Sequence, residues 1–320
     1  MKQLELESLS ADREAVKALL AALSDKDPIG RLSFEGRLVA IESEIRQLDA
    51  SHETTGSVAL LFAGDPVFGS RSIDAEFATT IVKSFQDMVA KRISSEEFGR
   101  LGTRGRIPER TASALAIKEL VRGSVGFILE ESTRNEHLTD TPIKKAIDEV
   151  TLVIEQASAE NSYAFESTIE NLDPRLLVSL REFFRALDDG GASVRIVEDE
   201  RDANLDANAV RRGRERVETT EVEDLEGETV TGEILGLLLD SRRFEMRLSE
   251  SGEIIKGTVA AGLAVKWLEL IELPNQRLVG QVWRTKMKIR EIRERNHPPR
   301  RLHSLQGLVE QVNRDAQASS

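Results

Sequence analysis

The apolar positions of the first fifty residues repeat with the period of an α-helix. One stripe, at intervals of three and four residues, runs from Val16 to Leu23, and a second runs from Phe34 to Leu48, with Ser33 as its expected N-cap. Asp27-Pro28 separates the two stripes. Residues 1–50 are therefore predicted to form a helical hairpin, which could pack on the next domain or on a second copy of the chain as a homodimer.

From Gly56 onward, strand patterns alternate with helical ones. The predicted elements are strands at 57–63 and 67–69, a helix at 74–93, strands at 114–121 and 124–130, helices at 142–157 and 174–187, and a strand at 193–197. This order favours an α+β fold, an antiparallel α/β layer domain over residues 55–200, rather than a doubly wound parallel sheet.

Residues 201–226 are dominated by charge. Four arginines between Arg211 and Arg216 are followed by acidic residues from Glu218 to Glu228, with few large apolar side chains among them. This pattern is typical of a solvated helix and linker. We therefore expect a domain boundary near Glu226.

The C-terminal part of the chain is rich in strand patterns. Strands are predicted at 229–239, 244–248, 253–259, 278–292 and 301–309, with a short helical or irregular segment at 263–271. Three strands, a helix and two strands is the order of a small five-stranded barrel of the OB type, and an SH3-like barrel is the alternative. Residues 227–311 are therefore predicted to form a small β-barrel.

One predicted strand of this barrel carries a basic face. Between Trp283 and Arg290 cations alternate with other side chains, and successive side chains of a strand point to opposite faces. The cations expected to share one open face are Arg284, Lys286, Lys288 and Arg290. They could bind nucleic acid or an acidic partner, or pair with Glu233 or Glu245 on neighbouring strands.

The distribution of charge limits what this face could bind. The chain carries a net charge of −12, whereas residues 227–320 hold 15 Lys and Arg against 12 Asp and Glu. An acidic body with a slightly basic module argues against a generic polyanion binder. Any attraction to nucleic acid must be local, within a Debye length of ~10 Å.

A second cationic segment is a loop rich in glycine and arginine. Guanidinium groups and backbone amides in such a loop could surround an anion, or the charges could simply keep an exposed connection in solution. The arginines of this candidate anion-binding loop are Arg100, Arg104, Arg106 and Arg110.

Residue types that carry catalysis are poorly represented. The absence of cysteine removes disulfides, thiolate metal sites and a cysteine nucleophile, and the four histidines lack metal-ligand spacing. No phosphate-binding glycine loop and no Gly-x-Ser-x-Gly elbow is present. We expect no catalytic residue, metal or cofactor. The apolar runs Val58–Ala63 and Ile234–Leu239 are far shorter than the ~20 residues of a membrane span, so we expect no membrane partner and a cytoplasmic location.

Two patches resemble an uncharacterised family of bacterial proteins. They are residues 61–74, Leu-Phe-Ala-Gly-Asp-Pro-Val-Phe-Gly-Ser-Arg-Ser-Ile-Asp, and residues 122–127, Arg-Gly-Ser-Val-Gly-Phe. The resemblance extends over residues 55–200. It implies a bacterial cytosolic protein and brings no known activity and no catalytic residues.

These patterns favour a non-catalytic protein that binds or bridges macromolecules, an adaptor whose barrel contacts nucleic acid or an acidic partner. Two alternatives remain open. One is an enzyme that acts on nucleic acid through a site not visible in the sequence. The other is a structural subunit dimerised by the N-terminal helices.

Overall fold

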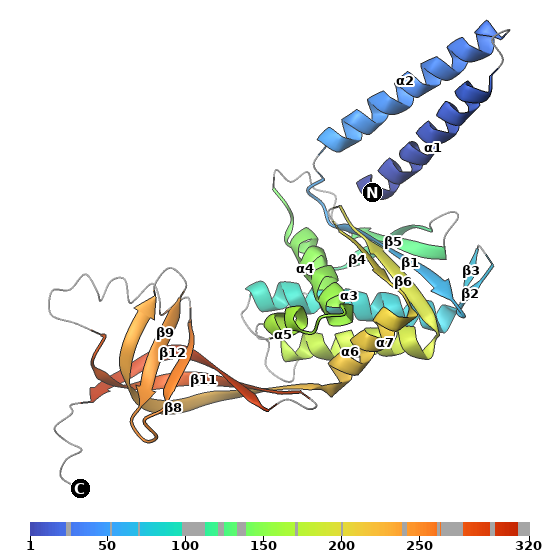
Figure 1. The fold of residues 1–320 in the computed structure, drawn as a ribbon. Helices are drawn as coiled ribbons and strands as arrows, with labels where there is room; N and C mark the ends of the chain where they lie inside the picture. The colour runs from blue at the N-terminus through green and yellow to red at the C-terminus, as the bar shows by residue number, and fades with distance from the viewer. Residues whose placement is uncertain are drawn as a thin grey trace. The chain divides into compact units, whose positions relative to one another are not determined.

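The chain divides into two compact units, Met1–Val217 and Glu218–Ser320 (Figure 1). The computed structural model describes residues 1–23, 27–51, 53–69, 71–97, 113–120, 125–132, 139–169, 172–199, 201–238, 242–260, 263, 278–294 and 298–312. Helices and strands occur together throughout, which confirms the predicted α+β class. The division falls after Val217 and thus before the expected position near Glu226.

The first two helices, α1 (Lys2–Ala22) and α2 (Pro28–Ala50), lie side by side as a hairpin. The second begins before Ser33, so the expected N-cap was wrong. Asp27 caps α2 instead, accepting a hydrogen bond of 2.8 Å from the Gly30 amide, with a proline in the first turn.

An antiparallel five-stranded sheet forms the centre of the first unit, in the order β4-β5-β1-β6-β7. Its strands are β1 (Ser57–Gly64), β4 (Leu115–Leu120), β5 (Val125–Glu131), β6 (Ala192–Val197) and β7 (Asp202–Leu205). The central strand β1 is buried from Ser57 to Phe62, so both of its faces are covered. A separate two-stranded ladder pairs β2 (Val67–Phe68) with β3 (Ser72–Ile73).

Helices cover one face of this sheet (Figure 1). They are α3 (Ala75–Glu97), α4 (Pro142–Ser158), α5 (Tyr163–Ile169) and α6 (Pro174–Asp189). The ring of Phe62 meets the ring of Phe77 on α3 edge to face, with centroids 5.5 Å apart, so alternate side chains of β1 point toward the helices. The other face, which carries Ala59, packs against the first turn of α1.

The charged segment 201–226 differs from the predicted helix and linker. It holds β7, α7 (Ala207–Thr219) and the first residues of β8. Leu205 of β7 and Val217 of α7 are buried, so both elements dock on the first unit. Three of the four arginines of α7 bind neighbouring elements: Arg212 donates to the carbonyl of Ser158, Arg214 pairs with Asp188 at 2.7 Å, and Arg216 donates to the carbonyl of Gln156. The charged composition therefore did not reveal that the helix is docked.

In the second unit, every strand has two paired neighbours. The strands are β8 (Thr220–Leu238), β9 (Arg243–Leu248), β10 (Ile254–Val259), β11 (Val282–Glu294) and β12 (Arg300–Val312). The pairing follows the order β8-β9-β10-β12-β11 and returns to β8, and only the pair of β10 with β12 is parallel. Alternate side chains point inward and fill the core: Ile234, Phe244, Met246, Ile255, Val259, Met287, Ile289 and Leu305.

Candidate interaction surfaces

The predicted basic strand is β11, and its first half shows two faces. Thr285, Met287 and Ile289 are buried, whereas Arg284 and Lys286, which alternate with them, are exposed. Over these residues the side chains alternate as the sequence predicts.

Lys288 and Arg290 do not continue the exposed face. The side chain of Arg290 is only 2% exposed and donates two hydrogen bonds, of 2.7 and 3.0 Å, to the carboxylate of Asp224 on β8. The ammonium group of Lys288 lies 3.1 Å from the same carboxylate. Two of the four predicted surface cations therefore belong to a buried group of charges, the Asp224 cluster, which consists of Asp224, Lys288 and Arg290.

A bulge in β8 brings Asp224 opposite Arg290. Between Met287 and Ile289 the strand β11 advances by two residues while β8 advances by three, from Glu228 to Leu225. The extra residue lies beside Gly227, whose φ of 81° costs glycine little. Continued pairing without the bulge would place Leu225 opposite Arg290, whereas the bulge places Asp224 there, within reach of both Lys288 and Arg290.

Charge pairing dominates the electrostatics of the Asp224 cluster. Burial of Asp224 raises the pKa of its carboxyl group, but the hydrogen bonds and charges of Arg290 and Lys288 lower it further than burial raises it. The pKa of Asp224 therefore lies below its ordinary value, and the group is ionised at neutral pH. Its role in the second unit is structural.

Arg284 and Lys286 remain at the surface. Arg284 is half-exposed and pairs with Glu310 of β12 at 2.5 Å, a partner other than the acidic residues expected from the sequence. Such exposed pairs contribute ~0–1 kcal/mol, so Arg284 can exchange partners with an external anion. Lys286 has no ion-pair partner among the described residues.

A second cationic surface, not singled out from the sequence, lies on the outside of β9 and β10. Arg243, Arg247 and Lys256 are exposed there. Lys256 pairs with Glu245 at 2.7 Å, and Arg247 pairs with Glu233 at 3.3 Å. The sequence signal for this surface is the alternation of charged residues with Phe244 and Met246 along β9.

Two arginines at one end of this surface are open to an external anion. Arg242 lies in the turn before β9, and Arg243 is paired across the sheet with Thr258. Neither side chain has an ion-pair partner in the described part of the chain. We call the exposed residues Leu238, Arg242, Arg243, Arg247, Ile254 and Lys256 the β9–β10 face.

Aromatic side chains suited to stacking on bases are scarce in the described part of the second unit. Phe244 is buried in the core, and Trp283 is half-buried with its indole N–H enclosed. Trp267 lies outside the described residues, as do the four arginines of the predicted anion-binding loop, Arg100, Arg104, Arg106 and Arg110. Proteins that bind single-stranded nucleic acid use aromatic platforms as well as cationic side chains. The described residues of this unit provide the cationic side chains but few aromatic platforms.

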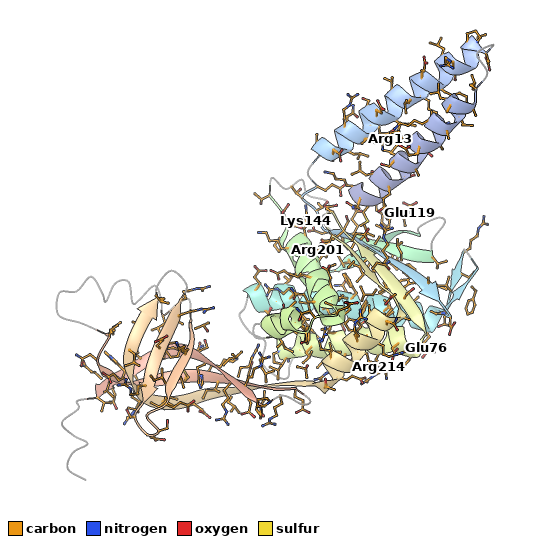
Figure 2. The ribbon with its side chains drawn as sticks, viewed as in Figure 1. Arg13, Glu76, Glu119, Lys144, Arg201 and Arg214 are labelled. Atoms are coloured by element: carbon orange, nitrogen blue, oxygen red, sulfur yellow. The ribbon has the colours of Figure 1, made fainter. Side chains whose placement is uncertain are left out.

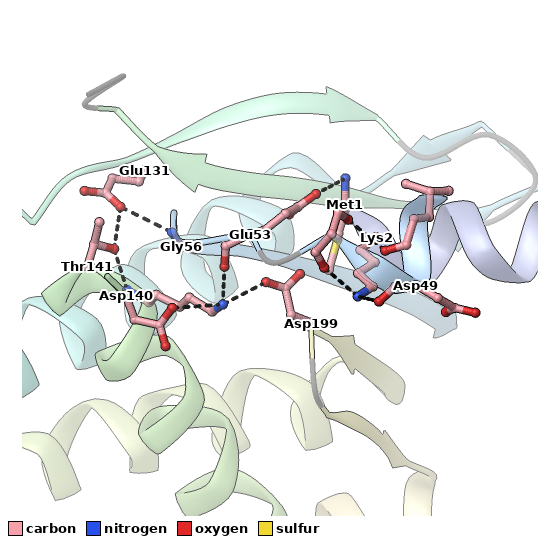
Figure 3. A network of polar contacts seen from close by, with 12 residues as sticks. Met1, Lys2, Asp49, Glu53, Gly56, Glu131, Asp140, Thr141 and Asp199 are labelled. Carbon is pink, nitrogen blue, oxygen red and sulfur yellow. Dashed lines mark hydrogen bonds and ion pairs between the residues drawn. The ribbon is translucent and has the colours of Figure 1, made fainter. Parts of the chain in front are cut away.

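In the first unit, a polar network joins the hairpin to the sheet (Figure 3). Lys2 of α1 donates to two backbone carbonyls at the end of α2, at 3.0 and 2.8 Å. Lys144 of α4 donates to the carbonyl of Glu53 and pairs with Asp199 at 3.3 Å. These contacts fix the chain between α2 and β1, so the network has a structural role.

Acidic side chains from α4 and from the end of β6 surround Arg201, which is labelled in Figure 2. Arg201 pairs with Asp148 of α4 at 2.6 Å and lies 3.5 Å from Glu198. Burial, together with the hydrogen bond and the charge of Asp148, raises the pKa of Glu198 to about 8. Among the described residues, no group of three or more His, Asp or Glu side chains has the arrangement of a metal site.

One lysine and one serine are hydrogen-bonded as in a catalytic dyad, but the serine is not accessible to a substrate. The Lys91 Nζ on α3 lies 2.6 Å from the Ser179 Oγ on α6, and burial lowers the pKa of Lys91. Ser179 is fully buried, so its hydroxyl group cannot meet a substrate. The pair holds α3 against α6.

The hairpin exposes apolar side chains on the side of α2 that faces away from α1. Ile29, Leu32 and Val39 are 82%, 73% and 63% exposed, and Gly36 lies between them with open space beside it. Their spacing of three, four and three residues places them on one stripe of the helix, the α2 stripe. The stripe toward α1 was predicted, whereas this second stripe was not.

Comparison with known proteins gave no match: no family model, no curated protein and no solved structure is significantly similar to the chain. Within the described residues, no helix has both the length and the apolar character needed to pass through a bilayer. The function is therefore inferred from the geometry of the chain itself.

Proposed function

We propose that the chain is a non-catalytic adaptor that binds an acidic macromolecule through the outer surface of its C-terminal unit. The supporting observation is that Arg242, Arg243 and Lys286 are exposed and have no ion-pair partner among the described residues. In a chain with a net charge of −12, such cations provide attraction that acts only locally. A polyanion would therefore bind at these side chains and be repelled elsewhere.

The strand order supports this proposal. Numbered from β8, the strands pair in the order 1-2-3-5-4 and back to 1, with a parallel pair between the third and fifth strands. We take this arrangement as an OB-type barrel, because an SH3-like barrel is built from antiparallel neighbours. OB-type barrels bind oligomeric ligands on the face of strands 2 and 3, which here are β9 and β10.

Retention of the full-length chain on a heparin column tests the proposal. The variant with Arg242→Glu, Arg243→Glu and Lys286→Glu should elute at a lower salt concentration than the unchanged chain, because the local attraction is gone. The matched control is Arg71→Glu with Lys83→Glu, which reverses exposed cations of the first unit. Equal elution of all three proteins, or no retention of the unchanged chain, would overturn the proposal.

The α2 stripe favours a second candidate function, that of a structural subunit dimerised by its N-terminal helices. Large apolar side chains exposed together on one face are typical of a surface that a partner covers. Light scattering should then give the mass of a dimer for the unchanged chain and of a monomer for the Leu32→Glu, Val39→Glu variant. A monomeric mass for both chains would exclude this candidate.

A further inference from the structure

We infer that the partner of the β9–β10 face is an acidic polypeptide segment that also carries apolar side chains. This inference rests on the proposed function and names the class of its partner. Two features favour a polypeptide over a nucleic acid as the partner: exposed aliphatic side chains beside the arginines, and the scarcity of aromatic platforms among the described residues of this unit.

The aliphatic side chains lie next to cations across the sheet. Leu238 of β8 is paired in register with Arg243, and Ile254 of β10 with Arg247. Leu238 is 63% exposed and Ile254 is 48% exposed. Each end of the face therefore presents an apolar group beside a guanidinium group. A phosphate backbone cannot make apolar contacts with the aliphatic side chains. A peptide with alternating acidic and apolar residues can contact both the guanidinium groups and the aliphatic side chains.

The ion pairs already present on the face allow such a partner to bind. Lys256 pairs with Glu245, and Arg247 pairs with Glu233; both cations remain exposed. Pairs of this kind contribute little, so carboxylates of a partner can replace those of the chain at small cost. Arg242 and Arg243 have no such pair to break among the described residues.

The closed pairing of the strands determines how the partner is held. Both edges of β9 and both edges of β10 are occupied by neighbouring strands. A peptide therefore cannot join the sheet through its backbone, as it does at a free edge. Side chains must carry the recognition, which makes binding depend on salt and on the partner's carboxylates.

Fluorescence anisotropy with the full-length chain tests the inference. The probes are a labelled peptide in which glutamates alternate with leucines, the same peptide with glutamine in place of glutamate, and labelled oligothymidylate. The glutamate peptide should bind more tightly than the other two probes. Arg242→Glu with Arg243→Glu should weaken it by roughly tenfold or more, as ~1.4 kcal/mol corresponds to tenfold. The control Arg71→Glu with Lys83→Glu should bind as the unchanged chain does.

A second variant separates this inference from the proposed function. Leu238→Ser with Ile254→Ser removes the apolar groups and keeps every charge, so it should weaken the glutamate peptide and leave oligothymidylate unaffected. If oligothymidylate binds at least as tightly as the peptide, the inference is overturned while the proposed function stands, with nucleic acid as the partner. If no probe binds, both are overturned.

Discussion

Arginine serves opposite purposes at two positions of the second unit. Arg290 is buried and bonded to Asp224, whereas Arg243 is exposed and has no ion-pair partner among the described residues. The two positions differ in their neighbours, because a bulge beside Gly227 brings Asp224 opposite Arg290, whereas Arg243 is paired in register with Leu238 and Thr258. Arginine is therefore part of the fold at position 290 and part of the proposed binding face at position 243.

Replacing Arg290 should therefore destabilise the second unit far more than replacing Lys286 does. Arg290→Ala leaves Asp224 buried with one partner fewer, and loss of one member of a buried pair costs ~3–5 kcal/mol. Lys286→Ala removes an exposed side chain and should change the free energy of unfolding by less than ~0.5 kcal/mol. Urea denaturation measures both values, and equal losses would contradict the buried position of Arg290.

The stability of the second unit should also fall in acid through Asp224. Its pKa is lower in the folded chain than the ~3.9 of the unfolded one, so its contribution is fully present above pH ~3.9. That contribution disappears as the pH falls through the folded pKa. Thermal midpoints between pH ~2 and ~6 should drop more steeply for the unchanged chain than for Asp224→Asn, and parallel curves would argue against the cluster.

Glu198 should have the opposite dependence on pH. Its pKa of about 8 means that the folded chain keeps a proton which the unfolded chain releases near pH ~4.5, so stability falls as the pH rises between these values. Glu198→Gln removes this loss and should stabilise the chain at pH 8 by on the order of 2 kcal/mol. Near pH 4 the stabilisation should vanish. Glu155→Gln, a half-exposed neighbour, is the control, and calorimetry gives the comparison.

At the scale of elements, periodic apolar patterns predicted most of the fold. They did not predict packing where an element consists mainly of charged residues. The hairpin, β1, α4 and α6 follow apolar stripes that the sequence displays directly. In α7 the buried residues are few and small, and arginines fill the rest of the helix. The bulge at Gly227 could not be predicted, because register depends on the partner strand. For the same reason, the sequence could not predict that Asp224 lies opposite Arg290 and pairs with it and with Lys288.

Gly213 tests how tightly α7 is docked. A Cβ at this position would lie 2.2 Å from the ring of Phe184, which is fully buried and cannot move aside. Gly213→Ala should therefore destabilise the first unit by ~1–3 kcal/mol. Gly36→Ala on α2, where a Cβ would meet nothing within 4 Å, should instead stabilise it by ~0.5–1 kcal/mol. Thermal denaturation followed by circular dichroism should show shifts of opposite sign, and a stabilising Gly213→Ala would mean that α7 packs differently.

At the scale of the whole molecule, the two units differ in charge. The second unit, Glu218–Ser320, holds 15 Lys and Arg against 17 Asp and Glu, a net charge of −2, so the first unit carries −10 of the chain's −12. Many cations of the second unit are paired inside the fold or at the surface, as at the Asp224 cluster and at Arg284. Among the described residues of this unit, exposed cations without an ion-pair partner include Arg242 and Arg243 of the β9–β10 face and Lys286, and this is why we propose the unit as the binding site of an acidic partner.

The most direct measurement is the affinity of the full-length chain for labelled polyglutamate as a function of salt concentration. We expect the affinity of the unchanged chain to fall steeply with salt. The variant with Arg242→Gln, Arg243→Gln and Lys286→Gln should bind weakly with little dependence on salt. The same salt dependence in both proteins would show that these three cations do not bind the partner.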